Sequence, residues 1–127
     1  MTLLHPLDNP WRRPVSAVDE ASLCWLLEEA TAAAFGVAPD DLRSSSRRGA
    51  TVAFARQSAM YLAHVVLGYN YSDVGRLFHR DRTTAAYACR LVEDRRDDPE
   101  IDIRLDLLER ACAEAIFGPV TLQPVQR

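Results

Sequence analysis

Lysine is missing from this sequence, and all fifteen of its basic residues are arginine. No glycine-rich loop ends in Lys-Ser or Lys-Thr, which excludes a nucleotide site of the P-loop kind. Long apolar runs are also missing, and none approaches the roughly 20 residues that a membrane span requires. The first residues lack the basic start and apolar core of a signal peptide, so we expect a cytoplasmic protein.

Cysteine is scarce and gives no sign of a metal site. Cys24, Cys89 and Cys112 are odd in number, far apart, and each on an apolar helical stripe. No two cysteine or histidine residues are spaced as a close zinc-binding pair. We therefore expect buried, reduced thiols and no metal. No set of nucleophile and base stands out either, so we expect no enzyme activity.

Charge is slightly negative overall but unevenly distributed. The formal net charge is −3 over 127 residues. Residues 43–96 hold ten arginines and four acids, a balance of +6, whereas the rest holds five arginines and fourteen acids, a balance of −9. This segregation is typical of a basic face on an acidic body, and arginine suits phosphate and guanine contacts. A GC-rich genome explains the choice of arginine over lysine at least as well.

Residues 71–96 carry the most informative pattern of the chain, which predicts two helices joined by a tight turn. The first helix is expected at Ser72–Phe78, with its serine as the N-cap. His79-Arg80 forms the turn, and Asp81 is the expected N-cap of the second helix. That helix carries a packing stripe of small residues at helical spacing: Ala85, Ala88, Cys89 and Val92.

The opposite surface of the second helix is polar. It presents Arg82 in its first turn, followed by Thr83, Thr84, Tyr87 and Arg90. A helix that packs by one narrow face and offers arginine and threonine from its N-terminal end suits the major groove of DNA. An ordinary helical hairpin with solvated arginines has the same spacing, so the pattern alone leaves both interpretations open.

The residue types favour the helix-turn-helix. Arg80-Asp81-Arg82-Thr83-Thr84, followed by Ala88-Cys89-Arg90, resembles the signature of the C-terminal DNA-binding domain of DnaA, the bacterial replication initiator. Similar segments precede it in the right order: Phe35–Val37, Asp41-Leu42, Arg43–Arg48, Val52–Gln57 and Ala59–Ala63. The resemblance covers about residues 21–96. It departs from the family at Arg82, where the family usually has histidine.

The resemblance implies an all-α, compact domain of five to six helices that contains a helix-turn-helix, at residues 16–117. Residues 1–15 are expected to form an extended arm, and residues 118–127 a tail. We expect the domain to stand alone, without an ATPase module, a cofactor, a nucleotide or a membrane partner. Its expected partner is double-stranded DNA with DnaA-box-like sites, which implies association with the nucleoid. DnaA itself or another replication protein is a further candidate partner.

Two functions follow from the resemblance. The first is sequence-specific binding of double-stranded DNA by a regulator of replication initiation or transcription. The alternative is a protein-interaction module derived from that domain, which has lost DNA affinity and binds a replication protein. Its surfaces would be Trp11, Trp25 if exposed, and the acidic side of the last helix.

The candidate contacts with DNA fall into two sets. The candidates for base edges are Arg82, Thr83, Thr84 and Asp81. The candidates for phosphates or the minor groove are Arg43, Arg47, Arg48, Arg56, Arg80, Tyr87 and Arg90. The serine-rich, glycine-terminated segment 43–49 is expected to be a basic loop that approaches the DNA backbone.

The remaining helices are expected from apolar periodicity and from capping residues. They lie at about Asp19–Phe35 after a capping box of Ser16 and Asp19, at Pro39–Leu42, at Ala50–Leu67 and at Pro99–Phe117. The last should bury Ile101, Leu105, Leu108, Cys112 and Ala115. Glu20, Glu28 and Glu29 are expected to form a solvated surface.

Overall fold

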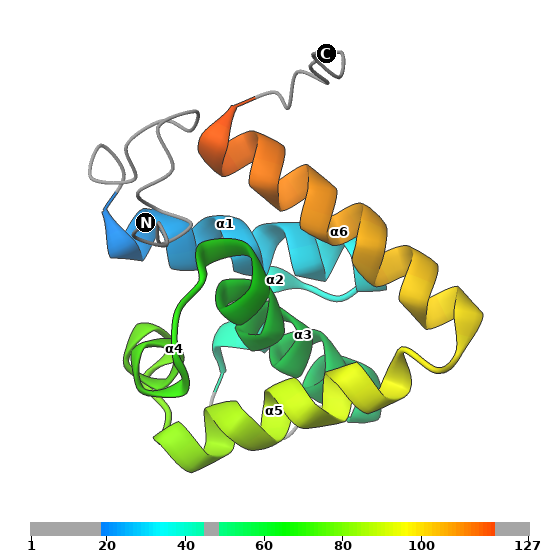
Figure 1. Cartoon of the computed structure of the whole chain (residues 1–127), viewed down its shortest axis with the longest axis horizontal. Helices are drawn as coiled ribbons and strands as arrows, with labels where there is room; N and C mark the ends of the chain where they lie inside the picture. Colours follow the sequence, from blue (N-terminus) through cyan, green and yellow to red (C-terminus); the bar gives the residue numbers. More distant parts are fainter. Residues whose placement is uncertain (1–18, 45–48, 119–127) are drawn as a thin grey trace, which may run out of the picture.

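The computed structural model describes residues 19–44 and 49–118, and every regular element within them is an α-helix (Figure 1). The helices are α1 (Glu20–Phe35), α2 (Pro39–Arg43), α3 (Ala50–Leu67), α4 (Tyr71–Phe78), α5 (Arg82–Arg95) and α6 (Pro99–Phe117). The expected all-α fold is confirmed. The predicted arm, Ser16 of the predicted capping box, and residues 119–127 of the predicted tail lie outside the described residues.

The central element is α3. It runs through the middle of the domain, with α1 and α6 on one side and α4 and α5 on the other (Figure 1). The residues that the helical period predicts to face inward are all buried: Val52, Ala55, Ala59, Leu62, Ala63 and Val66. Phe54, Met60, Tyr61 and Leu67 are buried as well. A helix that is packed from several directions buries most of its circumference, which a single-stripe prediction understates.

Helix ends mostly follow the predicted capping residues. The bounds of α3 and α6 match the prediction, and Asp19 caps α1 by accepting a hydrogen bond from the Ser22 backbone N–H at 2.8 Å. Gly36 and Gly68 end α1 and α3 in the left-handed conformation, with φ of 67° and 74°. Glycine adopts this conformation without the steric cost of a side chain, so both helices stop where the sequence indicates.

The predicted cap of α4 is wrong. Asn70 is the N-cap rather than Ser72, and its side-chain oxygen accepts a hydrogen bond from the Asp73 backbone N–H at 2.8 Å. Tyr71 is therefore part of the helix, and its ring stacks on the His64 ring of α3 with centroids 4.8 Å apart. Both candidates are good capping residues, so the choice between them rests on this tertiary contact.

The end of α6 also differs from the prediction. Its earlier inward residues are buried or half-buried, but Ala115 is exposed, and Ile116 and Phe117 are buried instead. From Cys112 the buried stripe continues by a step of four residues rather than three. Steps of three and four must alternate to follow a period of 3.6 residues, and the sequence pattern allowed either step here.

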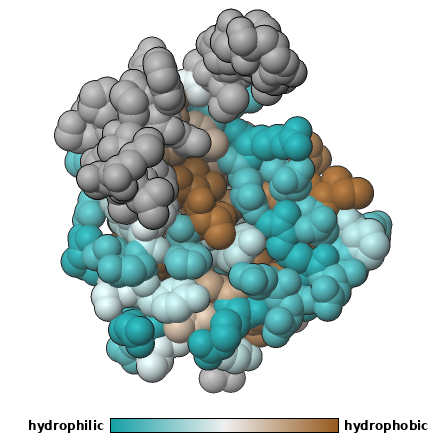
Figure 2. All heavy atoms as spheres, in the orientation of Figure 1, coloured by the Kyte–Doolittle hydropathy of each residue, from teal (hydrophilic) through white to brown (hydrophobic). Residues whose placement is uncertain are grey.

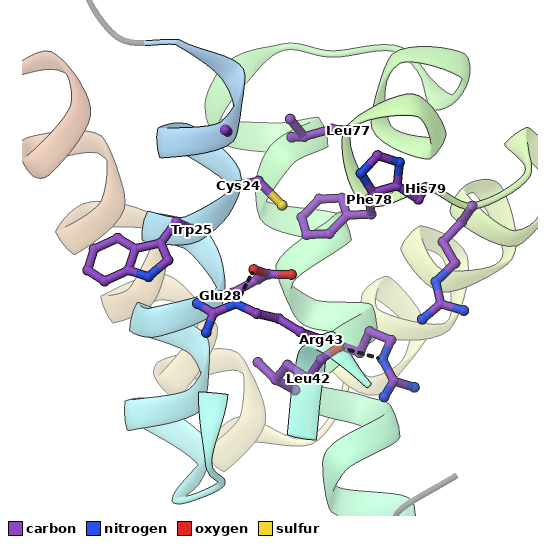
Figure 3. A pocket seen from close by; sticks show the side chains of 11 residues that line it. Cys24, Trp25, Glu28, Leu42, Arg43, Leu77, Phe78 and His79 are labelled. Carbon is purple, nitrogen blue, oxygen red and sulfur yellow. Dashed lines mark hydrogen bonds and ion pairs between the residues drawn. The ribbon is translucent and has the colours of Figure 1, made fainter. Parts of the chain in front are cut away.

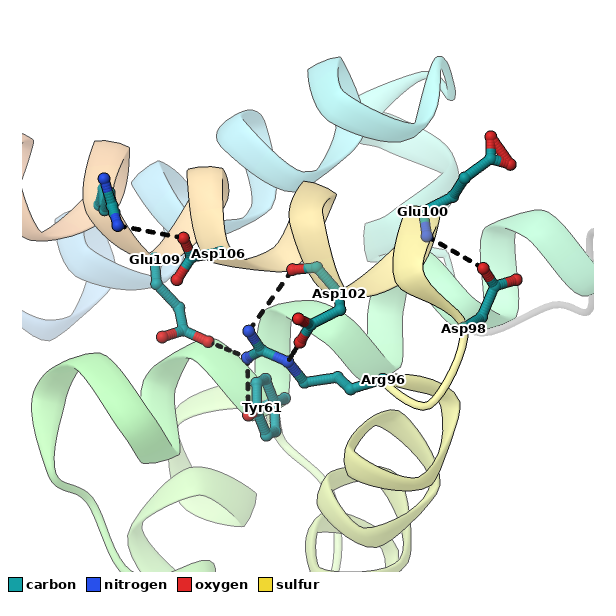
Figure 4. A network of polar contacts seen from close by, with 8 residues as sticks. Tyr61, Arg96, Asp98, Glu100, Asp102, Asp106 and Glu109 are labelled. Carbon is teal, nitrogen blue, oxygen red and sulfur yellow. Dashed lines mark hydrogen bonds and ion pairs between the residues drawn. The ribbon is translucent and has the colours of Figure 1, made fainter.

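A polar network joins the end of α5 to α3 and α6 (Figure 4). The Arg96 guanidinium donates to the Asp102 carboxylate at 2.6 Å, to the Tyr61 hydroxyl at 3.0 Å, and to the Glu109 carboxylate. Burial alone would lower the pKa of Arg96, but hydrogen bonds to these three groups outweigh it and raise that pKa. Arg96 therefore stays charged, and its hydrogen bonds hold the C-terminal end of α5 against α3 and α6.

The acidic residues of α1 are partly solvated, as expected for Glu20 and Glu29, but all three also form ion pairs with other helices. Glu20 accepts hydrogen bonds from Arg76 of α4 and, at 3.3 Å, from the Tyr69 hydroxyl. The hydrogen bond from Arg76 lowers the pKa of Glu20. Glu28 and Glu29 both pair with Arg43, at 2.9 and 3.0 Å. These pairs orient α4 and α2 on α1.

The three cysteines are free thiols; Cys89 and Cys112 are buried as predicted, whereas Cys24 is only half-buried. Burial raises the pKa of both Cys89 and Cys112 to about 11, so both are protonated near neutral pH. In the part of the chain that the structure describes, no helix is both long and apolar enough to cross a membrane.

Candidate nucleic-acid interface

The predicted helix-turn-helix consists of α4, a three-residue turn, and α5. His79 has left-handed backbone angles, φ 58° and ψ 47°. Its N–H donates to the Arg76 carbonyl at 3.3 Å, and the Arg80 N–H donates to the Gly75 carbonyl at 2.7 Å. This pair of bonds is the Schellman motif, which ends α4 and turns the chain sharply toward α5.

Gly75 permits this turn to lie close against α4. A Cβ atom built on Gly75 would be 2.6 Å from the Arg80 carbonyl oxygen and 3.1 Å from the Asp81 carbonyl carbon. Both are backbone atoms, so no side-chain rotation can relieve the contact. Gly75 is therefore a requirement of the turn, although it lies inside a helix, where glycine is normally unfavourable.

The two faces of α5 separate as the sequence predicts. The small-residue stripe is buried against the core, which places the α5 backbone close to α3 and α4. The opposite face is exposed and consists of Thr83, Tyr87 and Arg90, with Arg82 and Thr84 on either side of its first turn. Tyr87 is 55% exposed. We call Thr83, Tyr87 and Arg90, the exposed residues opposite the buried stripe, the ridge of α5.

Asp81 occupies the N-cap position of α5 but does not cap through its side chain. Its backbone is extended, with φ −67° and ψ 155°, and its carboxylate accepts no capping hydrogen bond. Its carbonyl accepts the first helical bond from Ala85 at 3.0 Å. The position is as predicted, whereas the capping bond is not formed. The Asp81 carboxylate is consequently exposed at the N-terminal end of the ridge.

Arg82 is the exposed cation nearest to the start of α5. For an exposed arginine at this place, an ion pair with Asp81 or Glu93 on the protein surface is the simple alternative to a DNA contact. Within residues 19–44 and 49–118, Arg82 has neither an ion pair nor a side-chain hydrogen bond. Its guanidinium therefore faces solvent beside the ridge.

Arg56 and Arg43, two of the predicted phosphate ligands, are bound to protein groups. Arg56 donates to the backbone carbonyls of Asp41, Leu42 and Ser44, each at 3.0 Å. Burial, followed by the nearby positive charge of Arg80, lowers the pKa of Arg56. Arg43 is held by the carboxylates of α1 described above. Both arginines anchor the start of the predicted basic loop, whose Arg47 and Arg48 lie outside the described residues.

A pocket of about 330 Å³ lies beside the turn (Figure 3). Leu77, Phe78 and Leu42 form apolar walls, and Trp25 lies at one side with 57% of its surface exposed. Burial and the charge of Glu28 raise the pKa of the Cys24 thiol in this pocket to about 12. The thiol is therefore protonated and a poor nucleophile at neutral pH. In the described part of the chain, no group of His, Cys, Asp and Glu is arranged to hold a metal ion.

Comparison with protein families gives a match over residues 26–92, from the middle of α1 to the later part of α5. The matching family is described as the bacterial dnaA protein helix-turn-helix, and the match covers more than half of the chain. The chain belongs to this DnaA family. The matched residues include α4, the turn and the ridge of α5, but not α6.

Individual DnaA proteins are similar over the same region. The chromosomal replication initiator protein DnaA of Bartonella quintana is 39% identical over 90 residues, which is 69% of this chain and 18% of that protein. DnaA of Caulobacter sp. is 37% identical over 86 residues, and DnaA of Clavibacter sepedonicus is 49% identical over 59 residues. This chain therefore spans less than a fifth of the length of these DnaA relatives.

The roles of three residues, in α3, in α4 and in the turn, differ from what the sequence predicts or were not predicted at all. Gly75 carries a signal in the sequence, because glycine inside an amphipathic helix indicates close backbone approach. His79 was placed in the turn, but its left-handed conformation was not predicted because histidine adopts it less readily than glycine. Arg56 was assigned to phosphate, since nothing local indicates that three carbonyls converge on its guanidinium.

Proposed function

We propose that this DnaA-family chain binds double-stranded DNA, with the first turns of α5 in the major groove of sites related to DnaA boxes. The main support is the exposed ridge of Thr83, Tyr87 and Arg90, opposite the buried stripe of α5. The ridge lies on the solvent side of α5, and the major groove, about 12 Å wide, admits an α-helix. The similarity to DnaA proteins supports duplex DNA as the ligand.

The base-contacting set we propose is Arg82, Thr83, Thr84 and Asp81. All four are exposed at the N-terminal end of α5, the part of a recognition helix that reaches base edges in helix-turn-helix proteins. The Arg82 fork matches the O6 and N7 acceptors of guanine, and the Asp81 carboxylate can accept from a cytosine amino group.

The backbone-contacting set we propose is Arg47, Arg48, Arg80, Tyr87 and Arg90. Arg56 and Arg43 act mainly by anchoring the loop that carries Arg47 and Arg48, because their guanidinium groups already bind protein atoms. Phosphate contacts made by this set position the protein on the duplex and carry no sequence information directly. The two sets are separable by experiment, because the loss of a phosphate contact weakens all duplexes alike, whereas the loss of a base contact changes the preference at one base pair.

We propose that the biological role is regulation of replication initiation or of transcription by occupying such sites. The sequence contains no P-loop, so no ATP-driven step is included in the proposal. The function is binding rather than catalysis.

The proposal is tested by fluorescence anisotropy with a duplex that contains a DnaA box and a scrambled duplex of equal length. At a fixed, moderate salt concentration, we expect the box duplex to bind at least about 1,000-fold more tightly. Equal affinity for both duplexes, or no binding to either, would overturn the proposal.

The backbone set predicts a change in salt dependence. Replacing both Arg47 and Arg48 with alanine should weaken box and scrambled duplexes alike. It should also flatten the plot of log affinity against log salt by up to about two units, one for each lost phosphate contact. Arg110→Ala, which removes an exposed arginine on α6, is the matched control and should leave the slope unchanged. An unchanged slope in the double variant would remove this loop from the interface.

Arg82 predicts a change in base preference. In Arg82→His, the fork that matches guanine is replaced by the residue usual in the family. We expect a loss of about 1–3 kcal/mol confined to one base pair, measured with duplexes that vary one base pair at a time. A uniform loss would instead indicate a phosphate contact, and no loss at any base pair would contradict a role in binding. Arg110→His controls for the change of charge.

A second function is favoured by Trp25, whose indole is 57% exposed beside the pocket. Exposed tryptophan is enriched where proteins bind one another. Under this alternative the chain binds a replication protein, such as DnaA, through α1. Trp25→Ala would then abolish binding to DnaA in a pull-down with purified protein, while leaving the anisotropy titration unchanged.

A further inference from the structure

One face of α6 carries exposed apolar side chains that neither the fold nor the proposed interface explains. Ile103 and Leu107 are each 61% exposed, and Ala111 is exposed one turn further on. Apolar atoms are visible at the surface along α6, at the right of Figure 2. Residues four apart are neighbours on a helix, so these three form one continuous apolar strip. The strip lies outside residues 26–92 of the family match.

Two charged residues extend this strip into a regular pattern. Arg104, Leu107, Ala111 and Glu114 follow one another at steps of three, four and three residues, the spacing of a seam between two packed helices. Arg104 and Glu114 are exposed, and within the described residues neither has an ion-pair partner. We call these four residues, with Ile103 at their edge, the α6 seam.

We propose that the α6 seam binds the α6 seam of a second copy of this chain, with the two helices antiparallel. A two-fold axis midway between Leu107 and Ala111 places Leu107 of one copy against Ala111 of the other. The same register, with no further adjustment, places Arg104 against Glu114 of the other copy. The two-fold axis repeats each pair once. The two inner layers therefore pair a large side chain with a small one, and the two outer layers pair a cation with an anion.

The self-complementary pattern identifies the partner as a second copy. Only a surface that binds a copy of itself must be complementary to its own antiparallel copy in charge and in side-chain size. A surface that binds a different protein is under no such constraint. The seam is small beside a standard interface of about 800 Å² per partner. We therefore expect a dissociation constant in the micromolar range, around 10–100 μM.

Dimerisation through α6 leaves the DNA-binding ridge accessible. In Figure 1 the first turn of α5 lies at the opposite edge of the molecule from α6. Each copy of the dimer therefore presents its own ridge. The inference does not depend on the proposed DNA binding, and it can hold whether or not that proposal does.

The first test measures self-association of the whole chain by sedimentation equilibrium. The wild-type chain should show a monomer–dimer equilibrium, and Leu107→Glu should lower the association constant at least about tenfold by placing two unpaired carboxylates in the seam. Val65→Glu changes an exposed apolar residue of α3 and should have no effect. A wild-type chain that stays monomeric up to about 1 mM, well above the expected dissociation constant, would overturn the proposal.

The second test exchanges the charges. Arg104→Glu creates carboxylate pairs in the seam, and Glu114→Arg creates arginine pairs, so each variant alone should be monomeric. Mixed together, the two variants restore opposite charges at both layers and should form a heterodimer about as tight as the wild-type dimer. Arg104 also lies over the Phe35 ring at 5.5 Å, so circular dichroism checks that Arg104→Glu is folded. Absence of a heterodimer between folded variants would overturn the register.

Discussion

Replacing Gly75 with alanine is expected to destabilise the domain by about 2–3 kcal/mol, in the upper part of the range for overpacked sites. The added Cβ would lie 2.6 Å from a backbone oxygen of the turn, so the turn itself must move. Thermal unfolding should show a Tm lower by roughly 10–15 °C for a domain of this size. Because the turn sets the position of α5, DNA affinity should fall even at temperatures where the variant is folded.

Gly36→Ala is the matched control for Gly75→Ala. At Gly36 an added Cβ meets no atom within 4 Å, but φ is +67°, so alanine there is strained by its backbone conformation alone, by about 1–2 kcal/mol. We expect lower stability with unchanged DNA affinity. The opposite result for Gly75→Ala, a rise in Tm, would follow if only helix propensity mattered, since alanine exceeds glycine by about 1 kcal/mol inside a helix. That outcome would contradict the close approach of turn and helix.

Replacing Arg96 with methionine is expected to cost about 1–3 kcal/mol of unfolding free energy. Methionine keeps most of the apolar stem but removes the donor that binds Tyr61, Asp102 and Glu109. The Arg96 side chain is only 19% exposed and that of Glu109 28%, so water compensates the loss only in part. We place the value below that of a fully buried ion pair because Asp102 is half exposed. Urea denaturation at neutral pH measures it.

Arg110→Met provides the comparison for Arg96→Met. Arg110 pairs with Asp106 at 3.3 Å on the outside of α6, and its side chain is 74% exposed. An exposed pair of this kind contributes at most about 0.5 kcal/mol, so this variant should unfold almost as the wild type does. Equal effects of the two substitutions would mean that the network in Figure 4 adds nothing beyond an ordinary surface pair.

Most of the secondary structure could be predicted from the sequence because its signals are local. The apolar period, Pro99 at the first position of α6 and the glycines that follow helices act within a few residues, and they placed α3 and α6 at their observed bounds. The failures occurred where two local signals were equally good. Asn70 and Ser72 both suit a cap, and the stacking of Tyr71 on His64 decides between them.

The candidate site was predictable in part. The exposed face of α5 follows from its buried stripe, since the two faces of one helix are tied by the helical period. The contacts of the arginines, by contrast, were not predictable. Arg82 and Arg96 are both arginines of the same basic stretch, yet the first faces solvent and the second is held by an aspartate and a glutamate of α6. No short-range pattern distinguishes them.

By itself, the sequence determined the order of the helices, the bounds of α3 and α6, the buried and exposed sides of α5, and the resemblance to the DnaA domain. The tertiary structure alone decided which cations are available to a ligand. Arg43 finds its carboxylates 14 and 15 residues away, and Arg76 finds Glu20 across 56 residues. The physical reason is that a guanidinium on a flexible stem binds whichever acceptor the packing of helices brings within reach, and that proximity is a property of the fold rather than of neighbouring residues.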